Sequence, residues 1–188
     1  DFQRKVKEFI KEMPARLKEY HEVFSGNVIA QNRLKGVGFL SREDAINYGV
    51  TGPSGRGSGW ACDVRKRSPY AAYDKVQFDE VLYNEGDSYA RYMVRMKEIE
   101  QSLHILEQLV DNIPEGDYLA KTKPIIKVPE GRYFKEVEAA RGAFGIYLES
   151  RGDKFPYRLK VNSPGFNLVG AVDHMTRGSK IADLIAIG

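Results

Sequence analysis

Two residues with chemically useful side chains, Glu138 and Arg141, lie in the stretch EAARGAFGIYLESRG. A carboxylate and a guanidinium three positions apart, followed by Gly142, can form a solvated ion pair or can flank a metal or redox centre. In a strand, residues three apart point to opposite faces, so these two side chains need not pair. One can face a cavity while the other anchors the backbone. From the residues alone, a structural role is favoured over a functional one.

Other arrangements that carry catalysis are not recognisable in the sequence. No H-E-x-x-H pattern occurs, and no Ser-His-Asp or Cys-His set has a convincing context. Cys62 is the single cysteine, which excludes an internal disulfide and a metal site built from several thiolates. The histidines, His21, His104 and His174, are widely separated and do not predict a zinc site.

A glycine-rich stretch, residues 49–60, raises the possibility of a phosphate-binding loop. A P-loop needs the pattern G-x-x-x-x-G-K-[ST], whereas residues 52–58 read GPSGRGS and lack the lysine. The dinucleotide pattern G-x-G-x-x-G is also absent. We therefore expect a loop in which the glycines adopt positive φ angles or allow close backbone approach.

Composition and charge are those of an ordinary globular domain. Of the 188 residues, 42% are hydrophobic and 29% are charged, which is enough apolar content for a core. The net charge of +3 gives no argument for nucleic-acid binding. The basic cluster at residues 65–67 is expected to form ion pairs or a charged rim. No apolar run approaches the roughly 18 residues that a membrane-spanning helix needs.

In the first half of the chain, apolar spacing and capping residues predict mainly helices. Residues 2–24 place apolar side chains three and four apart, which predicts a core-packing helix; Pro14 interrupts it and predicts a kink or a break near Met13. A short strand is predicted over residues 34–40. Ser41 is expected to cap a short helix that ends at Gly49. Asp87 is expected to cap the longest helix, of about 25 residues, which Pro114 follows.

The second half of the chain predicts strands. Residues 115–133 are expected to be irregular, and from Glu136 the pattern alternates with period two as far as residue 150. A reversal at residues 152–153 predicts an antiparallel hairpin. Ser179 is a candidate cap for a final helix that carries Ile181, Leu184 and Ile185. The expected fold class is α+β.

Several blocks resemble the 49-kDa-type subunit of the proton-pumping NADH:quinone oxidoreductase, respiratory complex I. The blocks are NYGVTGPSGRGSGWACDVRKRSPYAAYDKVQFD, GDSYARYMVRMKEIEQSL, VEAARGAFGIYLESRGDKFPYRLKVNSPGFNLVGAVDHM and GSKIADLIAIG. This 49-kDa-type subunit is itself similar to the large subunit of nickel-iron hydrogenases. The resemblance implies a helix-rich, hydrogenase-large-subunit-like fold with long helices and an antiparallel hairpin or small sheet. Residues 1–188 are expected to be an internal or C-terminal fragment of one domain of such a protein, truncated at both ends.

The resemblance also gives a meaning to Glu138 and Arg141. In nickel-iron hydrogenases a Glu-x-Pro-Arg-Gly stretch lies beside the metal centre, and residues 138–142 match it with alanine in place of proline. Complex I relatives lost the metal-binding cysteines and use the vacated cavity for quinone. The resemblance therefore implies that this chain binds no metal or cofactor and has no catalytic residue, and that Glu138 and Arg141 lie near the quinone cavity. The family's quinone-head ligands, a histidine and a tyrosine, lie upstream of Asp1.

As a function, the resemblance implies a quinone-site scaffold within a membrane-associated NADH:quinone oxidoreductase. Electrons would pass from the iron-sulfur cluster of a small partner protein to quinone, coupled to ion pumping, and the isolated fragment would be inactive. The implied partners are that iron-sulfur protein and other peripheral-arm components on the cytoplasmic side of the bacterial inner membrane, with membrane contact through the complex and no nucleic acid.

Two alternatives remain open. The chain can be the large subunit of an energy-converting nickel-iron hydrogenase or of a related donor-linked complex, or it can be a non-catalytic assembly module. The connection from Ile113 to Glu138 is shorter than in mitochondrial and proteobacterial relatives and resembles that of other membrane-bound oxidoreductases and energy-converting hydrogenases of the superfamily. This leaves the electron donor open between NADH, a reduced ferredoxin and another carrier.

Overall fold

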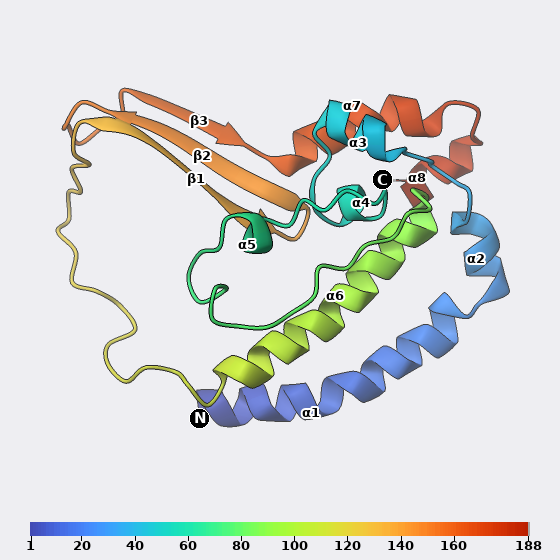
Figure 1. The fold of residues 1–188 in the computed structure, drawn as a ribbon, viewed down its shortest axis with the longest axis horizontal. Helices are drawn as coiled ribbons and strands as arrows, with labels where there is room; N and C mark the ends of the chain where they lie inside the picture. The colour runs from blue at the N-terminus through green and yellow to red at the C-terminus, as the bar shows by residue number, and fades with distance from the viewer. Residues whose placement is uncertain (188) are drawn as a thin grey trace.

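The computed structural model describes residues 1–187 and has long helices beside a small antiparallel sheet, which confirms the α+β class (Figure 1). The helices are α1 (Phe2–Tyr20), α2 (Val28–Leu34), α3 (Arg42–Tyr48), α4 (Gly52–Arg56), α5 (Val64–Arg67), α6 (Ser88–Leu109), α7 (Pro164–Thr176) and α8 (Leu184–Ile187). The strands are β1 (Gly131–Ala139), β2 (Gly142–Ser150) and β3 (Arg158–Asn162). A π-helical turn, His21–Ser25, follows α1, and a 3-10 turn, Ile181–Asp183, precedes α8.

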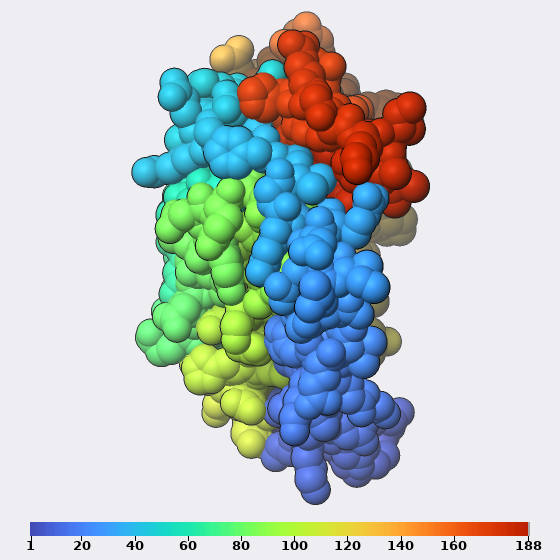
Figure 2. All heavy atoms as spheres, turned by 90° about the vertical axis from the view of Figure 1, so that its right-hand side faces the viewer, coloured from blue at the N-terminus to red at the C-terminus, as the bar shows by residue number. Residues whose placement is uncertain are grey.

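The two longest helices, α1 and α6, pack side by side and antiparallel (Figures 1 and 2). Their shared core contains Leu17, Met96 and Leu103, so α1 is a core-packing helix as predicted. Of the kink or break expected near Met13, the break does not occur, since α1 continues through Pro14 to Tyr20. Packing of its apolar face against α6 supplies the stability that the missing backbone hydrogen bond removes.

Helix α6 begins where the sequence predicts. The Oδ1 atom of Asp87 accepts a hydrogen bond of 2.8 Å from the backbone N–H of Ala90, which is the geometry of an N-cap. The helix has 22 residues and ends at Leu109, before Pro114. Residues 110–130 then run as a long loop without helix or strand to the start of β1 (Figure 1). The irregular segment expected over residues 115–133 is thus confirmed up to residue 130, whereas residues 131–133 already belong to β1.

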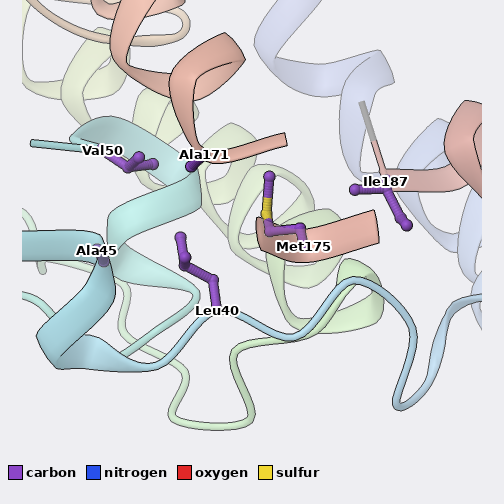
Figure 3. Close-up of a cluster of buried hydrophobic side chains, with 6 residues drawn as sticks. All are labelled: Leu40, Ala45, Val50, Ala171, Met175 and Ile187. Carbon is purple, nitrogen blue, oxygen red and sulfur yellow. The ribbon is translucent and has the colours of Figure 1, made fainter. Parts of the chain in front are cut away.

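A second core joins segments that are far apart in the sequence. It comprises Leu40, Ala45, Val50, Ala171, Met175 and Ile187, from the α3–α4 region, α7 and α8 (Figure 3). Ser41 caps α3 as predicted, because its Oγ accepts a hydrogen bond of 3.0 Å from Asp44 N–H. Gly49 ends α3 in the left-handed conformation, with φ of 67°. This core joins α3 and the segment before α4 to α7 and α8.

The sheet has the order β1-β2-β3, with both pairings antiparallel. Residues 136–150 were expected to form one strand, and this is wrong: β1 ends at Ala139 and β2 begins at Gly142. Ala140 and Arg141 make the reversal, and Glu138 pairs with Ala143. The second reversal, between β2 and β3, follows Ser150 and includes residues 152–153, as predicted.

Two further local expectations from the first half of the chain are wrong. Residues 34–40 contain the end of α2 and a turn followed by irregular chain instead of a strand, because Gly36 and Gly38 have φ angles of 69° and 65° that a strand does not accommodate. The glycine-rich stretch is not entirely a loop, since it contains α4; the expected positive φ angles do occur at Gly49, Gly52 and Gly59.

The C-terminal segment also differs from expectation. Ser179 does not cap a helix: the 3-10 turn starts after Lys180, whose backbone N–H donates to Asp183 Oδ2 at 3.0 Å. Helix α7, which precedes this turn, was not predicted from the sequence.

Candidate functional site

A cavity of about 780 Å³ lies where α6, the β1–β2 turn and α8 meet. Its wall includes Arg91, Arg95 and Glu98 from α6, Arg141 from the turn, and Ile185 from α8. These elements are distant in sequence (Figure 1). Helix α4 contacts both α6 and β2, and the core of α3, α7 and α8 holds α8 in place (Figure 3). The cavity combines charged groups with apolar side chains, a combination that is typical of small-molecule sites.

Arg141 occupies the two-residue turn between β1 and β2. Its side chain is exposed and lines the cavity. The two-residue turn places it there, and the sequence pattern did not predict this turn. Gly142, next to it, has φ of 128° and lies against Thr51 and Gly52, so a side chain at this position would collide with the start of α4. The absence of a side chain at Gly142 therefore allows the turn to pack closely against the start of α4.

Glu138 lies behind the cavity wall and anchors the hairpin. Its Oε1 atom accepts a hydrogen bond of 2.8 Å from Arg56 Nη1, and its Oε2 atom accepts one of 3.0 Å from Val64 N–H. The backbone N–H of Glu138 donates to Tyr70 Oη at 3.1 Å. These contacts tie β1 to α4, α5 and the segment after α5.

Arg56 is the centre of a buried charge network. Its side chain is 1% exposed and forms ion pairs with Glu98 at 2.5 Å, Glu138 at 2.8 Å and Asp63 at 3.9 Å. Burial on its own would lower the pKa of Arg56, but Glu98 and Glu138 outweigh burial and raise the pKa above its usual value. Removing one partner of a buried ion pair leaves an uncompensated buried charge, so these acids and Arg56 depend on one another.

Asp63 extends the network to α5. Its fully buried carboxylate pairs with Arg65 through Nη2 and Oδ2 at 2.6 Å. Burial raises the pKa of Asp63, but hydrogen bonds and charge from Arg65 dominate and hold it below its usual value. Arg67 pairs with Glu136 at 2.5 Å, so the ion pairs predicted for the basic cluster are confirmed.

Glu98 connects this network to the cavity. It pairs with Arg56 on one side and belongs to the cavity wall on the other. Burial raises the pKa of Glu98, and the charge of Arg56 opposes the rise without cancelling it. A continuous path of charged groups, Glu138–Arg56–Glu98, therefore runs from the base of the hairpin to the cavity.

Sequence reasoning missed Arg56 and Glu98. Arg56 stands two positions before the place where a phosphate-binding loop would require lysine, and an arginine between glycines was the signal that could have marked it. Nothing in the local pattern distinguishes Glu98 from other acidic residues of α6. Helix α4, in the glycine-rich segment, carries Arg56 into the interior.

Two further arginines on α6 face the cavity. Arg91 is 4% exposed; its Nη1 donates to the carbonyl oxygens of Gly38 at 2.9 Å and Gly86 at 3.1 Å, and its Nη2 donates to Ser88 Oγ at 2.9 Å. Burial, with the charge of Arg95, lowers the pKa of Arg91 to about 10.

Arg95 lies one turn further along α6, and its Nη1 donates to Arg91 O at 2.9 Å. Burial lowers the pKa of Arg95, and the charges of Arg141 and Arg56 lower it further against the opposing charge of Glu98. The cavity wall therefore carries three arginines and one glutamate, and it favours negative charge on whatever it holds.

Residues 1–187 offer neither a protein-built metal site nor a membrane span. No three histidine, cysteine or carboxylate side chains gather in this part of the chain in a way that could hold a metal ion. None of the helices between Phe2 and Ile187 combines the length and apolar character that crossing a membrane requires.

Comparison with known proteins gives consistent matches. The family described as "Respiratory-chain NADH dehydrogenase, 49 Kd subunit" matches residues 1–127 and 121–188. The C/D subunit of the NADH-quinone oxidoreductase of Phocaeicola vulgatus is 67% identical over 188 residues, which is 100% of this chain and 36% of that protein. The corresponding protein of Bacteroides thetaiotaomicron is 63% identical with the same coverage. The D subunit of the NADH-quinone oxidoreductase of Desulfotalea psychrophila is 50% identical over 183 residues, 97% of this chain and 49% of the relative. The chain thus spans between a third and a half of these relatives.

Proposed function

The chain belongs to the 49 kDa subunit family of the respiratory-chain NADH dehydrogenase, and from that premise we propose that it forms part of a quinone site in a membrane-associated NADH:quinone oxidoreductase. In this proposal electrons reach quinone from an iron-sulfur cluster held by a small partner protein, and their transfer is coupled to ion pumping. The chain itself contributes the wall around the acceptor and holds no redox cofactor.

The observation that carries the proposal is the position of Arg141 on the wall of the cavity. At about 780 Å³ the cavity lies within the range of small-molecule sites. Its wall also includes Tyr92, Ile99 and Leu168, which offer the apolar and aromatic surface that a quinone ring needs.

The proposed role of Arg141 is electrostatic. A quinone that accepts electrons develops negative charge on its oxygen atoms before protons reach them. A guanidinium placed beside that charge stabilises it, and does so most strongly where water is excluded. Arg95, on the facing helix, adds to the same field.

Glu138 has a positioning role in this proposal. Because Glu138 holds Arg56 and Val64 N–H, it fixes the end of β1, and the turn that carries Arg141 starts two residues later. Glu138 therefore acts on quinone through the placement of Arg141 instead of by direct contact.

We propose the remaining features of the assembly from the same premise. Residues 1–188 would be one part of a single domain, in contact with the small iron-sulfur protein and other components of a peripheral arm on the cytoplasmic side of a bacterial inner membrane. The names of the relatives support NADH-quinone oxidoreductase over a hydrogenase. Exposed aromatic side chains on α1, Phe2 and Phe9, are consistent with burial against neighbouring proteins of the complex.

The test is replacement of Arg141 by methionine in the intact assembly. We expect kcat/KM for quinone to fall about tenfold or more, because one charge-stabilising group is lost. The matched control is Arg132→Met, which removes an exposed arginine from the far end of β1. An Arg141→Met enzyme with the quinone rate and affinity of the control would overturn the proposal.

A further inference from the structure

The arginines of the cavity lack acidic partners among residues 1–187. Arg91, Arg95 and Arg141 all line the cavity, yet none of the three lies within 4.0 Å of a carboxylate oxygen in this part of the chain. Many other arginines do form such pairs, including the solvent-exposed Arg4 and Arg16. A cluster of unpaired guanidinium groups therefore marks this cavity.

The nearby acids are already engaged. Glu98 is paired with Arg56 at 2.5 Å. Asp87, which precedes α6, accepts hydrogen bonds from Gly36 N–H and Ala90 N–H, both at 2.8 Å. Neither acid has a carboxylate oxygen within 4.0 Å of the guanidinium of Arg95 or Arg141.

Leaving these charges together costs free energy. Like charges that share a site repel one another, and burial strengthens the repulsion because less water screens it. The lowered pKa of Arg91 and of Arg95 agrees with this geometry. Arginine is also the side chain best suited to carboxylate and phosphate, because its planar donors match two oxygen atoms at once.

We infer that the cavity binds an oxyanion, a carboxylate or phosphate group, held by Arg95 from α6 and Arg141 from the β1–β2 turn with Arg91 behind them. The inference rests on the proposed function, because it concerns the same cavity. It adds a second ligand, which is an anion and is distinct from the neutral quinone. The oxyanion occupies the arginine side of the cavity and joins the hairpin to α6. Its source is a free anion or a carboxylate of neighbouring polypeptide.

The test is amide hydrogen exchange of residues 138–144. It is measured on the intact purified assembly that contains this protein, in the absence of quinone. Exchange is measured with inorganic phosphate or succinate and compared with sodium chloride at the same ionic strength. A bound free anion slows exchange of this segment about tenfold at ten times its Kd. The variants are Arg141→Gln and Arg95→Gln, with Arg132→Gln as the control on the same hairpin.

Two outcomes support the inference and identify the source. If phosphate or succinate slows exchange and both cavity variants abolish the effect, the ligand is a free anion. If the segment is protected without added anion, and both Arg141→Gln and Arg95→Gln remove the protection while Arg132→Gln keeps it, the oxyanion is a polypeptide carboxylate.

Any other pattern overturns the inference, including exchange that responds to neither anion nor substitution. An effect of Arg141→Gln alone also overturns it, because that result reflects only the local structure of the turn. Since exchange is measured without quinone, the oxyanion site and the quinone proposal can fail separately.

Discussion

Arg56 Nη1 lies 2.8 Å from Glu138 Oε1, although 82 positions separate the two residues in the chain. The contact joins α4 to the end of β1 and sets the base of the turn that presents Arg141 to the cavity. The same guanidinium reaches Glu98 on α6, so one buried side chain holds three elements of the site.

Replacing Glu138 by alanine should lower the free energy of unfolding by about 2 to 3 kcal/mol, because Arg56 loses one of its partners while remaining buried. Urea denaturation of the protein measures the change. Glu136→Ala is the matched control on the same strand; its pair with the half-exposed Arg67 should cost about 1 kcal/mol or less. Equal losses in the two variants would contradict the buried network.

Replacing Arg56 by methionine should cost more, about 3 to 5 kcal/mol, since the buried carboxylates of Glu98 and Glu138 lose their cation. The loss should be smaller at acidic pH, because the raised pKa of Glu98 lets this carboxylate become neutral there. Unfolding experiments at neutral and mildly acidic pH measure the difference. Arg16→Met, which removes an exposed arginine of α1, should be near neutral at both. A penalty for Arg56→Met that does not change with pH would argue against the pairing.

Asp63 should contribute a pH-dependent part of stability. Because its pKa in the folded protein is lowered, its stabilising effect is present above its unfolded pKa of about 3.9 and is lost as pH falls through the lower folded value. Glu98, whose folded pKa is raised, acts in the opposite sense. Asp63→Asn should therefore flatten the acid limb of the stability curve below about pH 4. An unchanged acid limb would show that Asp63 is not paired in solution.

Cys62 should be almost inert in the native protein. Burial raises the pKa of its thiol to about 11, and the side chain is 1% exposed. The thiolate is the reactive form, so at about pH 8 alkylation by iodoacetamide should be about 100-fold slower than in urea-unfolded protein. As Cys62 is the single cysteine, mass spectrometry reads the rate without ambiguity. Comparable rates in the two states would mean that the α4 region opens readily.

Ser41→Ala should lower stability by about 1 kcal/mol, because it removes the hydrogen bond to Asp44 N–H at the start of α3. Ser179→Ala should have little effect, since the structure places the cap position at Lys180. Thermal denaturation of both variants measures the difference. A loss of stability for Ser179→Ala larger than that for Ser41→Ala would contradict the structure and support the helix cap that the sequence predicted at Ser179.

Local features of the sequence predicted the parts of the fold that depend on neighbouring residues. Ser41 and Asp87 mark helix starts because a side-chain oxygen reaches a backbone N–H only three residues away. Period-two alternation predicted one strand because residues 140–141 lack the Asn-Gly or Asp-Gly signature of a tight hairpin. The alternation pattern therefore could not predict the pairing register of β1 with β2.

The sequence alone determined the α+β class, the main helix starts, the ion-pairing of the basic cluster and, through its ordered blocks, the family. Tertiary structure alone decided that Arg56 and Glu98 belong with Glu138, and that Arg91, Arg95 and Arg141 share one cavity. The physical reason is distance along the chain: capping and periodicity act over a few residues, whereas a buried charge is stabilised only by whichever partners folding brings within a few ångströms.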